Sequence, residues 1–426
     1  MSVTSAMWAG VSGLNAEGQA LGVIGDNVAN ANTVGFKGSR ALFEDVLGGA
    51  AGSNLGAGVR MTRAQQIFGQ GAIQNTGQAT DLAISGDGFF VVKGVMSGVQ
   101  GQYFTRAGQT ALNADGFLTT PNGMRLQGYA VDANGVVGGN LGDVQISQQP
   151  LPPKPTSAMA LDANLDAGAT PPINPWDPAN PAATSNFSTS TTMYDSLGQP
   201  HAVDTYFVNT GPGTWEYHSV TDGAEVAGGT PGTAQEIASG TLTFDGNGAL
   251  ADSTAAGGTV DWAGATPGQA ITLDFGTSIA AGGTGLDGIT QYGSPNNIGQ
   301  QTQDGYGSGS LAGIRVDADG TVNGVYSNGE VVAVAQLGIA KFTANDGLDR
   351  TGQNMWSATK ESGEAAISAA GSGGRGAIVA GALEQSNVDI TQQFVELIVH
   401  QRSFQANSKT ITTADEMLQE VVNLKR

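Results

Sequence analysis

DITQQFVELIVHQRSFQANSKTITTADEMLQEVVNLKR (residues 389–426) carries a large apolar residue at every seventh position. These residues are Ile390, Leu397, Phe404, Ile411 and Leu418, with Phe394 and Val422 on a companion seam. A strict seven-residue apolar repeat is typical of a coiled-coil helix, whose seam must face another helix. At 1.5 Å per residue the helix is roughly 55 Å long, more than a small domain can bury. We therefore expect a long C-terminal helix with a helical partner.

The opposite end of the chain carries a second seven-residue repeat, which glycines weaken. Its apolar positions are Met7, Leu14, Leu21 and Val28, with Val11 beside them. Each interior glycine costs up to about 1 kcal/mol relative to alanine in a helix. We expect this N-terminal helix to be marginal alone and to need a partner. The pattern leaves two arrangements open, an antiparallel pair within one chain and packing between subunits.

Proline and charge divide the chain between these two ends. All 15 prolines lie within residues 121–295, so both ends are free of helix breakers. Residues 155–314 contain 15 acidic and no basic side chains, which accounts for −15 of the net charge of −20. Such a block predicts an inserted, solvent-facing domain with a discontinuous partner around it. Alternating patterns with Asp-Gly and Asn-Gly turns predict β-strands for most of the region between the ends.

Composition argues against several classes of function. The net charge of −20 opposes binding to nucleic acid or to anionic membrane surfaces, and no apolar run is long enough to insert in a membrane. The chain has no cysteine, and its three histidines (His201, His218 and His400) are far apart in the sequence. We therefore predict no enzymatic activity, no cofactor and no metal site. The polar N-terminus predicts that any export proceeds without a cleaved signal peptide.

The segment after the N-terminal repeat, NVANANTVGFKGSRALFEDVL (residues 27–47), closely resembles the signature of the flagellar rod and hook protein family. The residues that match the core of this family motif are Ala29, Asn30, Asn32, Thr33, Gly35, Phe36 and Lys37. Three further blocks resemble the same family in the expected order. They are TDLAISGDGFFVV (80–92), YFTRAG (103–108) and GALEQSNVDITQQFVELIVHQRSFQANSKTITTADEMLQEVVNL (381–424).

Two blocks in the middle resemble the hook members of this family rather than the generally shorter rod members. They are FSTSTTMYDSLGQPHAVDTYFV (187–208) and QTQDGYGSGSLAGIRVDADGTVNGVYSNG (301–329). The resemblance implies a structural subunit that polymerises into a curved tube, couples rod to filament and transmits motor torque as a flexible universal joint. It places the protein in the extracellular hook of the bacterial flagellum. The implied partners are copies of itself, the rod, the hook cap, the hook-filament junction proteins and the flagellar type III export apparatus.

Pattern and resemblance together predict a multidomain α+β fold, with paired, coiled-coil-like terminal helices and discontinuous, nested all-β domains between them. The expected parts are a terminal helical polymerisation domain (1–30 and 388–426), a connecting segment (31–72 and 360–387), an inner β-domain (73–148 and 300–359) and an acidic outer β-domain (149–299). The expected subunit-interaction residues are Met7, Val11, Leu14, Leu21, Val28, Ile390, Phe394, Leu397, Phe404, Ile411 and Leu418. Two alternatives stay open, a distal rod or other flagellar axial component and a secreted adhesin or glycan-binding β protein.

Overall fold

The computed structural model describes residues 3–47, 56–96, 98–132, 135–255 and 258–423. The chain forms two compact units. The first comprises Met1–Gln148, Gly313–Val325 and Val331–Arg426, and the second comprises Gln149–Ala312 and Tyr326–Glu330. The second unit is thus an insertion in the first. The division of the chain into four functional parts stays a prediction.

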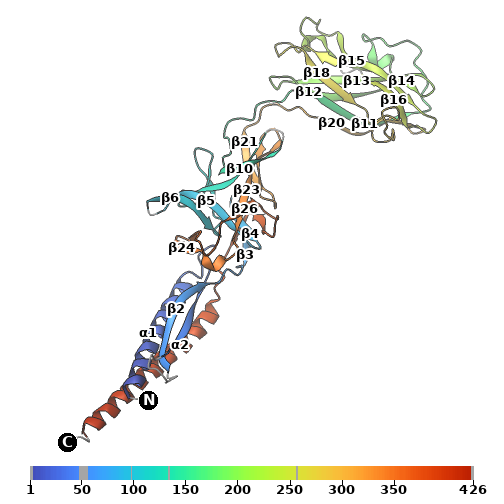
Figure 1. Cartoon of the computed structure of the whole chain (residues 1–426). Coiled ribbons are helices and arrows are strands. Elements are labelled where there is room, and N and C mark those ends of the chain that lie inside the picture. The colour runs from blue at the N-terminus through green and yellow to red at the C-terminus, as the bar shows by residue number, and fades with distance from the viewer. Residues whose placement is uncertain (1–2, 48–55, 97, 133–134, 256–257, 424–426) are drawn as a thin grey trace. The chain divides into compact units, whose positions relative to one another are not determined.

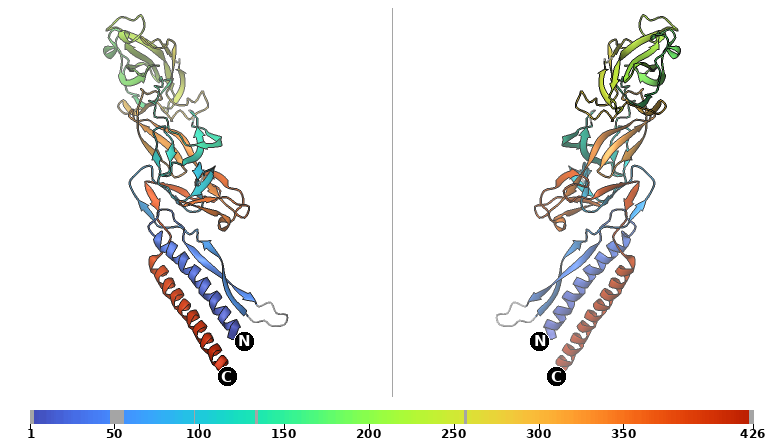
Figure 2. Two further views of the ribbon diagram at one scale, coloured as in Figure 1. Left: turned by 90° about the vertical axis from the view of Figure 1, so that its left-hand side faces the viewer. Right: turned by 90° about the vertical axis from the view of Figure 1, so that its right-hand side faces the viewer.

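Two long helices of the first unit lie side by side and antiparallel (Figures 1 and 2). They are α1 (Val3–Ala29) and α2 (Ile390–Asn423), and they confirm the predicted pair of terminal helices. Asp389 caps α2, because its Oδ1 accepts hydrogen bonds from the backbone nitrogens of Thr391 at 2.8 Å and Gln392 at 3.2 Å. An antiparallel hairpin of β1 (Ser39–Leu47) and β2 (Gly56–Gln66) runs along α1 (Figure 2).

The rest of the first unit is mainly one branched sheet. Its strand order is β21 (Leu311–Val316), β22 (Thr321–Tyr326), β23 (Val331–Lys341), β9 (Arg125–Val131), β5 (Phe89–Met96), β6 (Val99–Thr105), β25 (Met355–Ser357) and β24 (Asp349–Gly352). Short strands extend it, namely β10 (Val137–Asp143), β8 (Leu118–Thr119), β7 (Ala111–Leu112) and β26 (Ala366–Ala369). A short 3-10 turn, η3, spans Asn345–Gly347. The buried rings of Phe89, Phe104 and Trp356 belong to the apolar core that packs against this sheet.

Two small strand pairs join segments from opposite halves of the sequence. They are β4 (Leu82–Ser85) with β27 (Ala377–Ala380), and β3 (Ile73–Asn75) with β28 (Ala382–Glu384). Both pairs are antiparallel. They bring the chain that leaves α1 and the chain that approaches α2 to the same place.

The second unit consists of two five-stranded sheets around one apolar core. One sheet has the order β17 (Gly258–Val260), β18 (Gln269–Asp274), β11 (Ala158–Asp166) and β19 (Thr290–Tyr292), with β20 (Asn297–Gln303) also on β11. The other has the order β12 (Phe187–Tyr194), β13 (Pro200–Gly211), β14 (Thr214–Asp222), β15 (Ala234–Phe244) and β16 (Leu250–Ala255). The 3-10 turns η1 (Pro181–Ala183) and η2 (Gly223–Glu225) lie in its connections. Alternate residues of β11 and β14, such as Leu161 and Trp215, are buried in the shared core.

Candidate assembly surface

The two terminal helices pack so closely that a Cβ atom on either of two glycines of α1 would displace a side chain of α2. A Cβ atom on Gly13 would lie 2.7 Å from the side-chain nitrogen of Asn407. A Cβ atom on Gly10 would lie 2.9 Å from Cγ1 of Ile411. The closest approach of the helices therefore places two glycines of α1 against Asn407 and Ile411 of α2, and Ile411 belongs to the seven-residue repeat.

Polar side chains also connect the two helices. His400 Nδ1 lies 2.5 Å from Glu17 Oε2, and Asn27 Nδ2 donates a hydrogen bond to Gln393 Oε1 at 2.9 Å. Asn27 is itself buried, and its Oδ1 accepts a hydrogen bond from the backbone nitrogen of Ser39 at the start of β1. These contacts fix the pairing of α1 with α2 and tie both helices to the hairpin.

The companion seam of α2 is largely exposed in the single subunit, and its role between subunits stays a prediction. Phe394 and Val422 are 51% and 68% exposed. The polar residues that reach α1 are Gln393, His400 and Asn407, one position before the companion seam. Polar residues and Ile411 meet the glycine-rich helix, whereas Phe394 and Ile398 are left about half exposed.

Each of the predicted subunit-interaction residues is only half-buried or is exposed in the single subunit. Those that are half-buried are Met7, Val11, Leu14, Leu21, Val28, Leu397, Ile411 and Leu418, and those that are exposed are Ile390, Phe394 and Phe404. The buried positions of α1 are instead Gly10, Gly13, Ala16, Ala20, Ile24 and Asn27. Further large apolar side chains are exposed on the same helices, namely Trp8, Val395, Ile398, Val399 and Met417. A single subunit thus leaves a broad apolar surface of its helices uncovered, which is typical of an interaction site.

The β1–β2 hairpin covers one flank of α1. Ser12 Oγ accepts a hydrogen bond from the backbone nitrogen of Val59 at 3.1 Å and donates one to the carbonyl of Ala9 at 2.8 Å. The hairpin also contacts α2, because the ring of Phe43 on β1 lies 6.1 Å from the ring of His400. The hairpin, α1 and α2 therefore form one packed body.

The family motif forms the exit from α1. Ala29 ends the helix, and both Ala29 and Asn32 are exposed. Thr33 Oγ1 donates a hydrogen bond to Asn30 Oδ1 at 3.1 Å, which stabilises the turn. Gly35 has a φ of +69°, and a Cβ atom there would lie 2.5 Å from the backbone nitrogen of Ala107. Both the backbone conformation and the space require glycine at this position.

The last two motif residues are buried. Phe36 and Lys37 are each 1% exposed, and Lys37 Nζ lies 2.6 Å from Glu384 Oε1. Arg106 Nη1 lies 3.2 Å from the other carboxylate oxygen of Glu384. Sequence reasoning did not identify Arg106 or Glu384. The sequence feature that could have indicated them is the position of Lys37 directly after the large apolar residue Phe36. A lysine buried with such a neighbour needs a carboxylate partner.

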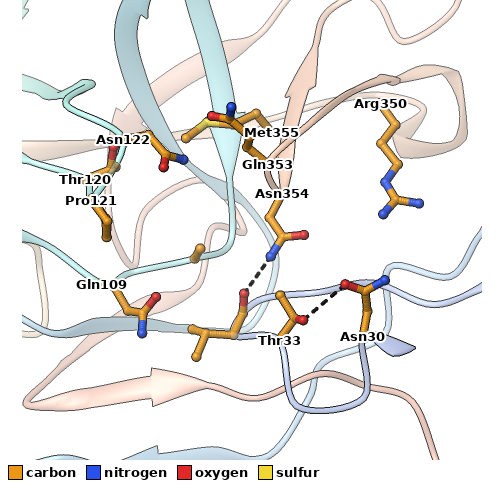
Figure 3. A pocket seen from close by; sticks show the side chains of 12 residues that line it. Asn30, Thr33, Gln109, Thr120, Pro121, Asn122, Arg350, Gln353, Asn354 and Met355 are labelled. Atoms are coloured by element: carbon orange, nitrogen blue, oxygen red, sulfur yellow. Dashed lines mark hydrogen bonds between the residues drawn. The ribbon is translucent and has the colours of Figure 1, made fainter. Parts of the chain in front are cut away.

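A cavity of about 380 Å³ lies beside the motif (Figure 3). Its lining consists of Asn30, Thr33, Val34, Ala107, Gln109, Thr120, Pro121, Asn122, Arg350, Gln353, Asn354 and Met355. Two of these lining residues are bonded to each other, because the Asn354 side chain donates a hydrogen bond to the carbonyl of Val34 at 3.0 Å (Figure 3). Among these lining residues are amides, hydroxyls and one arginine, without the histidine or carboxylate that would act as a general base.

Two further properties concern the whole described part of the chain. Within residues 3–47, 56–96, 98–132, 135–255 and 258–423, no helix is both long enough and apolar enough to span a bilayer. Over the same residues, histidine and carboxylate side chains do not gather in groups of three that could hold a metal ion.

Family models match most of the chain in sequence order. Residues 7–37 match the model described as flagella basal body rod protein, and residues 83–154 match the flagellar hook protein FlgE/F/G D1 domain. Residues 161–306 match the flagellar basal body protein FlaE D2 domain. Residues 379–424 match the flagellar basal body rod FlgEFG protein C-terminal model. The four matches include both terminal helices and both β-rich regions.

Individual relatives match over nearly their full lengths. The flagellar hook protein FlgE of Escherichia coli (strain K12) is 36% identical over 421 residues, covering 97% of this chain and 98% of the relative. The flagellar hook protein FlgE of Treponema pallidum (strain Nichols) is 35% identical over 470 residues, covering 99% of each chain. The crystal structure of Helicobacter pylori flagellar hook protein FlgE2 has a similar fold, with a TM-score of 0.52 at 16% identity over 72% of this chain and 98% of that one. The sequence matches show that this chain belongs to the flagellar hook protein family.

Proposed function

We propose that copies of this hook subunit dock through the exposed apolar faces of α1 and α2 and so form a helical tube. The observation that carries the proposal is the set of large apolar side chains that α2 leaves uncovered after it has packed on α1, led by Phe394, Ile398 and Phe404. Burying one such side chain contributes about 1.5–3 kcal/mol relative to leaving it exposed. Several from each copy are enough to offset the costs of association.

The charge pattern of α1 supports the same proposal. Glu17 and Asp26 are its only ionisable side chains. Both have partners inside the chain, because Glu17 contacts His400 and Asp26 accepts a hydrogen bond from Arg350. A helix that faced water along one side would normally carry many charges there. The open side of α1 is therefore suited to burial against another copy.

The four predicted parts take different roles in this proposal. Residues 1–30 and 388–426 polymerise, residues 31–72 and 360–387 connect them to the β-domains, and residues 73–148 and 300–359 form the inner β-domain. The acidic residues 149–299 face solvent, where like charges keep the contacts between neighbouring copies weak. Firm apolar contacts between the helices, combined with weak contacts elsewhere, would let a curved tube bend while it transmits torque from rod to filament.

The proposed partners beyond further copies of this chain are other flagellar proteins. Models described as rod proteins match residues 7–37 and 379–424, so the same helical ends can pack on rod subunits where hook and rod meet. We extend the proposal to the hook cap, the hook-filament junction proteins and the flagellar export apparatus, which the family resemblance implies. The function is mechanical and requires no catalytic step.

The test is a double substitution on α2, Phe394→Asp with Ile398→Asp. Both side chains are about half exposed in the subunit, so the variant should keep the helical circular dichroism and the unfolding midpoint of the parent. We expect it to form no tubes by electron microscopy and no fast-sedimenting material, because assembly would bury two unpaired charges per copy.

The matched control is Ile173→Asp with Leu197→Asp in the second unit. These side chains are 101% and 62% exposed, and the substitutions add the same charge without changing the helices. The control should assemble as the parent does. Normal tubes from the α2 variant would overturn the proposal.

A further inference from the structure

Three buried charged side chains, Lys37, Arg106 and Glu384, come from three distant parts of the first unit. We call them the buried charge cluster. Lys37 follows α1 in the family motif, Arg106 follows β6, and Glu384 ends β28 shortly before α2. The side chains of Lys37 and Glu384 are 0% exposed and that of Arg106 is 5% exposed. The cluster lies at the point where both terminal helices connect to the β-rich part of the unit.

Backbone groups from two further segments complete the cluster. Lys37 Nζ donates a hydrogen bond to the carbonyl of Gly69 at 2.8 Å, and Glu384 Oε1 accepts one from the nitrogen of Gly71 at 2.9 Å. Arg106 Nη2 donates to the carbonyl of Gly86 at 2.8 Å. Most of the polar side-chain atoms of the cluster are therefore hydrogen-bonded. The exception is Arg106 Nε, which has no hydrogen-bond partner among the residues that the structure describes.

The motif segment also contacts the cluster through its backbone. The nitrogen of Gly35 donates a hydrogen bond to the carbonyl of Glu384 at 2.7 Å. Asn387 Oδ1 accepts a hydrogen bond from the nitrogen of Gly38 at 2.8 Å. The segments on either side of Lys37 and Glu384 are thus held together by several short bonds, and neither can move far while these bonds persist.

The charges of the cluster do not balance, since two cations share one carboxylate. Burial lowers the pKa of Lys37 and of Arg106, and the attraction of Glu384 opposes that change in both. Without Glu384, two cations would face each other in a site that excludes water. The closed arrangement around Lys37 is therefore favourable only when the segment that carries Glu384 is in place.

We propose that the buried charge cluster couples the ordering of residues 34–38 to that of residues 381–388, so that each segment is ordered only when the other has docked. Lys37, Arg106 and Glu384 are then positioning residues, which fix where α1 ends and where α2 begins. The inference concerns the single subunit and does not rest on the proposed docking between copies.

Hydrogen exchange measured by mass spectrometry on the dilute, full-length chain tests this coupling. In Glu384→Gln, exchange in residues 34–38 should be faster than in the parent by on the order of 100-fold or more, in step with residues 381–388. Exchange in β14 of the second unit should not change. The control Glu364→Gln removes the same charge from an exposed carboxylate of the first unit and should leave residues 34–38 protected.

A suppressor variant separates coupling through charge from a general loss of packing. Lys37→Met with Glu384→Gln removes one cation together with the anion, so residues 34–38 should exchange about tenfold more slowly than in Glu384→Gln alone. If Glu384→Gln alone does not fold, a folded double variant is the expected rescue. The inference is overturned if residues 34–38 stay protected in Glu384→Gln, or if the double variant is no better protected or folded than that single variant.

Discussion

Asp304 organises the start of β11 in the second unit. Its Oδ1 accepts hydrogen bonds from the backbone nitrogens of Ser157 at 2.7 Å and Ala158 at 2.9 Å. Its Oδ2 accepts one from Ser157 Oγ at 2.6 Å and lies 3.1 Å from Lys154 Nζ. Burial alone would raise the pKa of Asp304, but these donors outweigh burial and hold the pKa well below its ordinary value of 3.8.

The lowered pKa of Asp304 predicts how acid affects the second unit. A carboxylate with a depressed pKa in the folded state contributes stability above its unfolded pKa, and this stability is lost as the pH falls below 3.8. Asp304→Asn should therefore cost about 2 kcal/mol at pH 7 and flatten the loss of stability between pH 4 and pH 2. Urea unfolding of the parent and the variant across this pH range checks both expectations. An unchanged midpoint at pH 7 would contradict them.

At the scale of single elements, the glycines of α1 fall into two environments. Gly13 faces Asn407 at a distance that leaves no room for Cβ, whereas a Cβ atom on Gly18 would meet nothing within 4 Å. Gly18→Ala should stabilise the helix pair by about 0.5–1 kcal/mol, because alanine loses less entropy in a helix. Gly13→Ala should instead destabilise it by about 1–2 kcal/mol, because the added methyl group displaces the Asn407 side chain from its place against α1.

The measurement is the urea midpoint of the helical circular dichroism signal in the two alanine variants, taken in dilute protein. The two variants control for each other, since both make the same replacement in one helix. Equal shifts of the midpoint in the same direction would show that the contact between Gly13 and Asn407 does not govern the packing.

The same helices show what a sequence pattern can predict. The seven-residue repeat correctly predicts two paired helices, because the period of the pattern follows from helical geometry. It does not identify the face that packs within the subunit. Large residues such as Leu14 and Leu21 dominate a hydrophobic pattern, but the closest contact uses Gly10 and Gly13. The role of the large residues between subunits stays a prediction.

Long-range pairing is less accessible from sequence. β11 pairs in parallel with β18 and β19 on one edge and antiparallel with β20 on the other. No local signal distinguishes these neighbours, because turn residues specify only hairpins between consecutive strands. Lys37 and Glu384 are 347 positions apart in the sequence, so their contact could not be predicted for the same reason.

At the scale of the whole molecule, charge is distributed unevenly between the two units. Residues 155–314, which make up most of the second unit, carry 15 acidic and no basic side chains. We expect that copies of this chain joined by their helices also bring their acidic units within range of one another. Their mutual repulsion opposes assembly, and dissolved salt screens it.

Assembly should therefore depend on ionic strength. The screening length falls from about 10 Å at 0.1 M salt to about 3 Å at 1 M, so sodium chloride should lower the protein concentration at which tubes form. Sedimentation of the parent at several salt concentrations measures this threshold. The Phe394→Asp, Ile398→Asp variant should stay soluble throughout, which excludes simple salting out. A threshold that rises with salt would mean that attraction between charges, rather than apolar contact, drives assembly.

The turn between η2 and β15 has a practical consequence for imaging. Gly228 and Gly232 both have positive φ angles, and a Cβ atom on either would meet nothing within 4 Å. The turn is exposed and belongs to the second unit, whereas both chain ends belong to the first. A short epitope or dye-accepting peptide inserted there would label the protein in living cells without changing either helix. A fusion at either terminus would instead lie next to the paired helices.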